Sequence, residues 1–307
     1  MKHSEPANAQ LHTILNEFIE QHQLAHSYID TAQKWFMPLA NIISQHQLSA
    51  DCPILVGING CQGSGKSTLT SFLVTVLNEI FHQSTIGFSI DDFYLSKAQR
   101  LILSKSVNPL LATRGAPGTH DIDFLETTLN RLLLGKDVKL PIFNKAIDDL
   151  APIAQWIPIN SPHKIIILEG WCVGIDSQSQ QDLLTPVNEL EALEDPSLNW
   201  RQYVNDVLSV DYKRVFKLID YTVMLKAPSF EQVFEWRSEQ EHKLIKKLQL
   251  NQTDRNAGIN TMSDDQILRF VQFYQRLTQH ALTNMPAKCD SLFTLDTRRR
   301  IETCLHK

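Results

Sequence analysis

The eight residues from Gly60 to Ser67, G-C-Q-G-S-G-K-S, constrain this chain more than any other stretch. They fit the pattern G-x-x-x-x-G-K-[ST], a phosphate-binding loop (P-loop) that lies between a strand and a helix. Residues 54–58 are a β-branched run typical of a buried strand, and residues 69–81 carry apolar side chains at helical spacing. The stretch therefore predicts a strand, a P-loop and a helix, in that order.

The residue types in this loop suit a polyphosphate ligand. Glycine permits the positive φ angles that turn successive backbone N–H groups inward, and the following helix adds its positive end. Lys66 is expected to reach the β- and γ-phosphates, and the Ser67 hydroxyl to bind Mg²⁺. We assign the ATP contacts to Gly60, Gly63, Ser64, Gly65, Lys66, Ser67 and Thr68. The alternative is a glycine-rich turn that binds nothing.

Length and composition fit a globular protein with a sizeable core, since 43% of the 307 residues are hydrophobic. The net charge of −5 and the lack of a long basic run argue against a nucleic-acid partner. The five cysteines form no C-x-x-C pair, which favours a reducing compartment over a disulfide framework or a zinc site. No signal-peptide pattern or membrane-length apolar run is present, so we expect a cytoplasmic protein with no membrane partner.

Further segments extend the α/β pattern. Four more apolar runs predict strands, which makes five in all: residues 85–90, 165–168, 221–225 and 291–295. Residues 8–47 predict two helices, so we expect a helical extension over 1–50 on a domain over 51–307. Prolines place residues 138–145 and 153–159 in an edge hairpin outside the main sheet. The polar stretch 176–200 predicts a solvated acidic loop or irregular helical insertion.

Acidic residues directly follow two of the predicted strands. Asp91 and Asp92 come after residues 85–90, and Glu169 comes after residues 165–168. The carboxyl ends of parallel strands form the edge of the sheet where ligands bind. Glu169 occupies the place of the second residue that handles Mg²⁺ in P-loop enzymes. We interpret these acids as functional; the alternatives are helix capping by an aspartate and a plain surface carboxylate.

Three other side chains are candidates with an open alternative. Arg114 and His120 lie in a loop marked by glycine and proline, where they either face an anionic substrate or are solvated. Arg237 lies in a predicted lid over residues 228–262 that closes on the transferring phosphoryl group, unless its helix face is merely solvated. The Cys61 thiol lies near a helix N-terminus, which can lower its pKa and favour oxidation, and an oxidised thiol would block nucleotide binding. The alternative is that Cys61 only occupies a position of the motif that tolerates any residue.

With these motifs the chain resembles the P-loop small-molecule kinases that include pantothenate kinase, uridine kinase and phosphoribulokinase. It is most similar to the D-glycerate 3-kinase family. The residues that carry the resemblance span roughly 51–296 and include Gly60–Ser67, D-D-F-Y at 91–94, R-G-A-P-G-T-H-D at 114–121, P-I-F-N-K at 141–145 and L-E-G-W at 168–171. The resemblance implies a doubly wound parallel sheet and transfer of the γ-phosphoryl group of ATP to a small hydroxy acid, with D-glycerate as the expected acceptor.

The resemblance also implies a role for each site residue. Asp91 accepts the proton of the acceptor hydroxyl, while Glu169 and Asp91 are outer-shell partners of an Mg²⁺ at Ser67. Arg114 and Lys145 hold the acceptor's carboxylate, and Arg237 belongs to the lid. The other predicted substrate contacts are Asp92, Tyr94, His120 and Glu169.

One departure from the family concerns the acceptor. Better-known family members have a longer loop here, which contains glycine and arginine, whereas this chain has A-I-D-D-L at residues 146–150. A kinase for pantothenate or a nucleoside therefore stays open, as does a regulatory protein that hydrolyses ATP without transfer.

Overall fold

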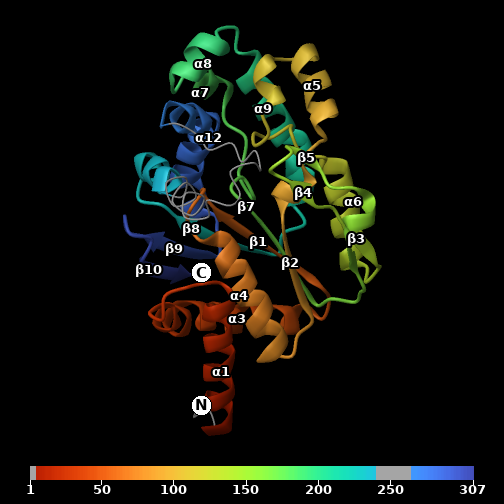
Figure 1. The fold of residues 1–307 in the computed structure, drawn as a ribbon, viewed down its shortest axis with the longest axis vertical. Helices are drawn as coiled ribbons and strands as arrows, with labels where there is room; N and C mark the ends of the chain where they lie inside the picture. The colour runs from red at the N-terminus through yellow and green to blue at the C-terminus, as the bar shows by residue number, and fades with distance from the viewer. Residues whose placement is uncertain (1–4, 240–263) are drawn as a thin grey trace, which may run out of the picture.

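The computed structural model describes residues 5–239 and 264–307. A six-stranded sheet in the order β10-β9-β8-β1-β7-β2 lies at its centre (Figure 1). Its strands are β1 (Ile54–Gly60), β2 (Thr85–Ser89), β7 (Ile165–Gly170), β8 (Tyr221–Lys226), β9 (Ser291–Leu295) and β10 (Ile301–His306).

Five of these strands are parallel, which confirms the predicted parallel sheet. The sixth strand, β10, was not predicted and runs antiparallel to β9 at the sheet edge. None of its side chains is fully buried, and it contains Glu302, Thr303 and His306, so it has no apolar run that marks a strand.

Helices cover both faces of the sheet, because neighbouring side chains of the central strands point to opposite faces. In β1, Ile54 and Val56 join one core cluster, while Leu55 joins the other. The first cluster contains residues of α1 (Glu5–Gln21), α3 (Met37–Ala50) and α4 (Lys66–Glu79). The second contains residues of α6 (Ile122–Leu133), α9 (Asn199–Val207), α10 (Lys213–Phe216) and α12 (Asp264–Asn284). The chain is thus doubly wound, as the resemblance implied.

The N-terminal helices pack directly on the sheet layer. A short helix, α2 (Tyr28–Thr31), and a π-helical turn (Ala32–Phe36) connect α1 to α3. Phe18 of α1 meets Phe72 of α4 edge to face at 5.6 Å, and Phe36 meets Phe293 of β9 at 5.9 Å. These helices therefore share one apolar core with the strands. None of the helices in the described ranges is long and apolar enough to cross a membrane.

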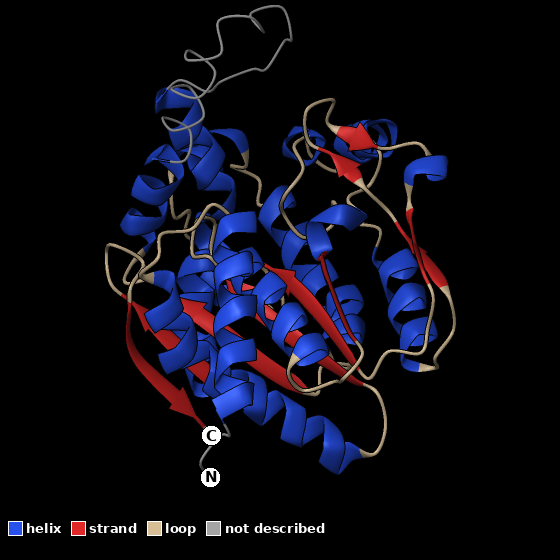
Figure 2. Cartoon of the chain, turned by 60° about the horizontal axis from the view of Figure 1, so that its bottom comes forward, coloured by secondary structure: helices blue, strands red, loops and turns tan. Residues whose placement is uncertain are grey.

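Two short antiparallel pairs lie outside the main sheet (Figure 2). They are β3 (Val138–Leu140) with β6 (Ile157–Ile159), and β4 (Phe143–Asn144) with β5 (Asp149–Leu150). The first pair confirms the predicted edge hairpin. A further helix, α5 (Lys97–Ser106), precedes a 3₁₀ turn at Pro109–Ala112.

The acidic segment 176–200 is the irregular helical insertion that was one of its two predictions, but it is not solvated throughout. It forms α7 (Gln180–Leu183), α8 (Glu189–Glu194) and the start of α9. Glu191 and Asp195 are buried, because Arg276 of α12 pairs with Glu191 at 2.7 Å and Arg201 pairs with Asp195 at 3.0 Å. The segment is therefore fastened to α12, which reaches the candidate site.

Candidate functional site

The P-loop connects β1 to α4, as its motif predicts. Gly63 and Gly65 have φ angles of 80° and 93°, a backbone conformation that residues other than glycine rarely adopt. A Cβ atom on Gly60 would lie 2.5 Å from the Ser64 hydroxyl, so the turn also needs a glycine there for space. Gly60 and Ser64 are buried and do not line the cavity, whereas Gly63, Gly65, Lys66, Ser67 and Thr68 do.

Glu169 lies behind the loop, at the end of the neighbouring strand β7. It is 6% exposed, and its Oε1 accepts a hydrogen bond of 2.7 Å from the Ser67 hydroxyl. Its Oε2 lies 3.8 Å from the Lys66 ammonium and has no hydrogen-bond partner among the described residues. A buried carboxylate oxygen without a partner, beside a serine hydroxyl, suits an Mg²⁺ that takes its other ligands from phosphates and water. The residues present therefore fit the implied metal.

Asp91 follows β2 in a 3₁₀ turn, Ile90–Phe93, where the Ser89 hydroxyl accepts a hydrogen bond from its backbone N–H. The Tyr94 hydroxyl donates to one carboxylate oxygen and the Lys145 ammonium to the other, each at 2.9 Å. Burial favours the neutral acid, but Lys145 and Lys66 outweigh it and lower the pKa of Asp91 below its ordinary value. The carboxylate is thus ionised.

Arg114 lies across the cavity from the P-loop and is itself held by an acid. Its guanidinium pairs with Asp148 and covers the ring of Phe143 at 5.4 Å. Asp148 also pairs at 3.0 Å with Arg100, which is fully buried and donates to the Asp148 backbone carbonyl. The short loop 145–148 thus supplies a cation to Asp91 and a carboxylate to Arg114.

Three predicted substrate residues do not line the cavity: Glu169, which lies behind the P-loop, His120 and Asp92. His120 is 4% exposed behind Tyr94, on which it stacks at 4.4 Å, and its Nδ1 shares a hydrogen bond of 2.6 Å with the Tyr212 hydroxyl. Burial lowers the pKa of His120 to about 4, so it is neutral and has no positive charge for an anion. The Asp92 carboxylate is partly buried, and burial and Asp91 raise its pKa to about 6 although the backbone of Phe143 and Ser89 acts in the opposite direction. We therefore withdraw these three residues from the set of direct substrate contacts and keep Glu169 for the metal.

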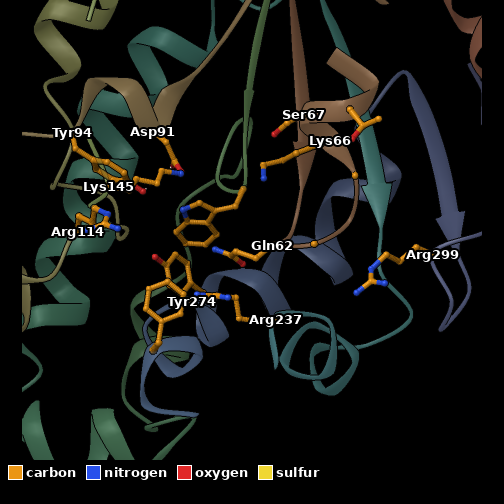
Figure 3. Close-up of a pocket in the computed structure, with 15 residues that line it drawn as sticks. Gln62, Lys66, Ser67, Asp91, Tyr94, Arg114, Lys145, Arg237, Tyr274 and Arg299 are labelled. Atoms are coloured by element: carbon orange, nitrogen blue, oxygen red, sulfur yellow. Dashed lines mark hydrogen bonds and ion pairs between the residues drawn. The ribbon is translucent and has the colours of Figure 1, made fainter. Parts of the chain in front are cut away.

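The cavity itself measures about 630 Å³ and brings the remaining candidates together (Figure 3). Asp91, Tyr94, Arg114 and Lys145 lie on one side, while Lys66 and Ser67 lie on the other. Arg237 is at the rim, with its guanidinium 5.4 Å from the ring of Phe270. It belongs to a helical segment over 230–239; the rest of the predicted lid, residues 240–263, lies outside the described residues.

Sequence reasoning did not assign five lining residues to the site. They are Gln62, Trp171, Phe270, Tyr274 and Arg299. Gln62 and Trp171 fall inside motifs that were recognised. Arg299 is the middle residue of an arginine triplet, and Phe270 and Tyr274 lie on one apolar stripe of α12, patterns that exposed or core residues also show.

Cys61 does not fit the redox hypothesis. It is 6% exposed, and burial raises the pKa of its thiol to about 12 despite the nearby Lys66. The thiol is therefore protonated and enclosed, which disfavours reaction with an oxidant.

Comparisons with known proteins agree with the geometry. Residues 55–199 match the model of the phosphoribulokinase / uridine kinase family. An uncharacterized kinase of Schizosaccharomyces pombe is 35% identical over 72% of this chain and 78% of its own length. The chloroplastic D-glycerate 3-kinase of Arabidopsis thaliana is 30% identical over 72% of this chain, which spans 46% of that relative's length.

A solved structure shares the fold. The D-glycerate 3-kinase of Cryptococcus neoformans superimposes with a TM-score of 0.71 at 24% identity and covers 88% of this chain and 99% of its own. At that identity the likeness concerns the fold alone. The relatives and the fold together confirm the resemblance to D-glycerate 3-kinases. The chain belongs to the phosphoribulokinase / uridine kinase family of P-loop kinases.

Proposed function

We propose that this kinase transfers the γ-phosphoryl group of ATP to a hydroxyl of a small hydroxy acid, D-glycerate, and forms 3-phosphoglycerate. One observation carries the proposal. An ionised carboxylate, Asp91, shares a cavity with the P-loop residue Lys66 and with two cations on the acceptor side, Arg114 and Lys145. A protein that only binds or hydrolyses ATP has no need of an acceptor side of this composition.

The phosphate side supplies charge and position. Lys66 and the backbone N–H groups of the P-loop contact the phosphates and stabilise the charge that develops during transfer. Mg²⁺, when bound beside Ser67 and Glu169, neutralises further phosphate charge. Arg237 at the rim places another guanidinium within reach of the transferred group.

The acceptor side orients the alcohol. Arg114 binds the carboxylate of the hydroxy acid through the N–H groups that Asp148 does not use, and Lys145 adds a second positive charge. The acceptor hydroxyl then replaces one of the two donors on Asp91. Asp91 accepts its proton late in the transfer, which a weakly basic carboxylate can do because bond formation to the phosphorus is also late.

Two similar proteins favour D-glycerate as the acceptor. The Arabidopsis protein and the Cryptococcus structure are both named D-glycerate 3-kinase. The proposal also includes a helical extension over 1–50, a kinase domain over 51–307 with a lid over about 228–262, and a location in the cytoplasm.

A panel of acceptors assayed by ADP release tests the proposal. It contains D-glycerate, L-glycerate, glycerol, pantothenate and uridine, each with ATP and Mg²⁺. We expect D-glycerate to give the highest kcat/KM. A higher kcat/KM with pantothenate or uridine would identify that compound as the acceptor instead of D-glycerate. ADP release that is independent of every alcohol would indicate a regulatory ATPase rather than a kinase.

A further inference from the structure

The Tyr274 side chain is a further part of the acceptor side of the cavity. It lies on α12, lines the cavity, and is 5% exposed. Within the described residues its hydroxyl has no hydrogen-bond partner, and the hydroxyl oxygen is open to the cavity rather than enclosed by protein.

The position of this hydroxyl is fixed by packing. The Tyr274 ring meets Trp171 edge to face at 4.9 Å, and the Trp171 indole N–H donates to the Gly115 carbonyl at 3.1 Å. A Cβ atom on Gly115 would lie 2.2 Å from the Tyr274 hydroxyl oxygen, so only glycine leaves room for it. The hydroxyl is thus held against the residue that follows Arg114 in the chain.

The surrounding charges define what the hydroxyl recognises. Burial and then the negative charge of Asp91 raise the pKa of Tyr274 well above its ordinary value, so the group stays a neutral hydrogen-bond donor. Arg114 and Arg237 flank it (Figure 3), which makes an anionic oxygen the favoured acceptor of its proton. Because Lys66 and Ser67 lie across the cavity, this oxygen belongs to the alcohol substrate rather than to the P-loop-bound phosphates.

We propose that Tyr274 is a binding residue for the acceptor, and that its hydroxyl donates a hydrogen bond to the carboxylate that Arg114 holds. The inference rests on the proposed transfer to a hydroxy acid. It assigns to α12 a direct part in acceptor specificity, and it explains why Gly115 leaves space for a tyrosine.

The test is Tyr274→Phe, with Tyr28→Phe as the matched control. Within the described residues the Tyr28 hydroxyl likewise has no hydrogen-bond partner, but it is enclosed by the N-terminal helices and does not line the cavity. Steady-state rates with D-glycerate and with ATP are measured for the wild type and both variants, together with melting temperature. Loss of a hydrogen bond to a charged group predicts that KM for D-glycerate rises about ten- to a hundredfold in Tyr274→Phe.

The same variant should keep the KM for ATP within about twofold and the melting temperature of the wild type, because the lost hydroxyl had no protein partner. Tyr28→Phe should match the wild type in both KM values. An unchanged KM for D-glycerate overturns the inference, as does a lowered melting temperature with both KM values altered, which indicates a structural role. A wild type inactive with every hydroxy acid refutes the proposed acceptor class instead, and the two tyrosine variants are then compared on the acceptor that the panel identifies.

Discussion

Replacement of Asp91 by asparagine separates its role in catalysis from its role in folding. The substitution keeps the shape of the side chain and an oxygen that accepts from Tyr94, but it removes the charge that pairs with Lys145. Lys145 is 61% exposed, so this ion pair contributes at most ~1 kcal/mol to the free energy of unfolding. Asp91→Asn should therefore stay folded, with a melting temperature lowered by a few degrees at most.

The catalytic loss should be larger. Without a proton acceptor for the alcohol, kcat should fall at least about a hundredfold, which corresponds to ~2.7 kcal/mol of transition-state stabilisation. The assay is ADP release at saturating ATP and D-glycerate, with melting temperature measured on the same preparation. Tyr94→Phe is the control, because it removes one donor to Asp91 and leaves the carboxylate in place. A folded Asp91→Asn variant with near-normal kcat refutes the assignment of the base.

Three further substitutions test the rest of the site. Lys66→Ala should lower kcat at least about a hundredfold in the ADP assay with little change in melting temperature, since the ion pair between Lys66 and Glu169 is long at 3.8 Å. Asp148→Asn should reduce the free energy of unfolding by about 1–3 kcal/mol in urea titrations, because buried Arg100 loses its counter-charge. The same variant should raise KM for D-glycerate but not for ATP, because Arg114 loses the carboxylate that holds it. An unchanged KM for D-glycerate would show that Arg114 does not need Asp148 to bind the acceptor. Burial and Asp91 raise the pKa of Asp92 to about 6, so the folded state retains a proton that the unfolded chain releases from about pH 4 upward. The free energy of unfolding of the wild type should therefore fall, relative to that of Asp92→Asn, on the order of 2 kcal/mol between about pH 4 and pH 7. Parallel pH profiles of the two proteins would contradict this.

The phosphate side of the site could be predicted because its determinants are local in sequence. The strand, the turn and the helix around Gly60–Ser67 are contiguous in sequence, and the glycines of the motif indicate where the backbone has positive φ angles. Glu169 was found from the same logic, since an acid that ends a buried parallel strand lies at the edge where ligands bind. The parallel strands were equally visible as apolar runs.

The acceptor side is different because its partners are distant in the chain. Asp148 lies 34 residues from Arg114, and Tyr212, which keeps His120 out of the cavity, lies 92 residues from it. Nothing in the local pattern shows such pairing. The acids Glu191 and Asp195 looked solvated for the same reason, since Arg276, the partner of Glu191, comes from another helix.

Tyr274 was overlooked for a separate physical reason. On a helix, a tyrosine within an apolar stripe has the same spacing as a core residue, and only the surroundings of its hydroxyl distinguish the two. The one available signal was Gly115 in the loop after Arg114, which a turn alone also explains. Only the packing of α12 against that loop shows that Gly115 leaves room for the Tyr274 hydroxyl.

Phosphorus NMR of a reaction that contains the enzyme, ATP, Mg²⁺ and D-glycerate tests phosphoryl transfer most directly. We expect a phosphomonoester signal, identified as 3-phosphoglycerate, to grow in step with ADP, and to be absent when Lys66→Ala or Asp91→Asn replaces the wild type. Release of inorganic phosphate alone, at the same rate with and without D-glycerate, would contradict the proposed kinase reaction.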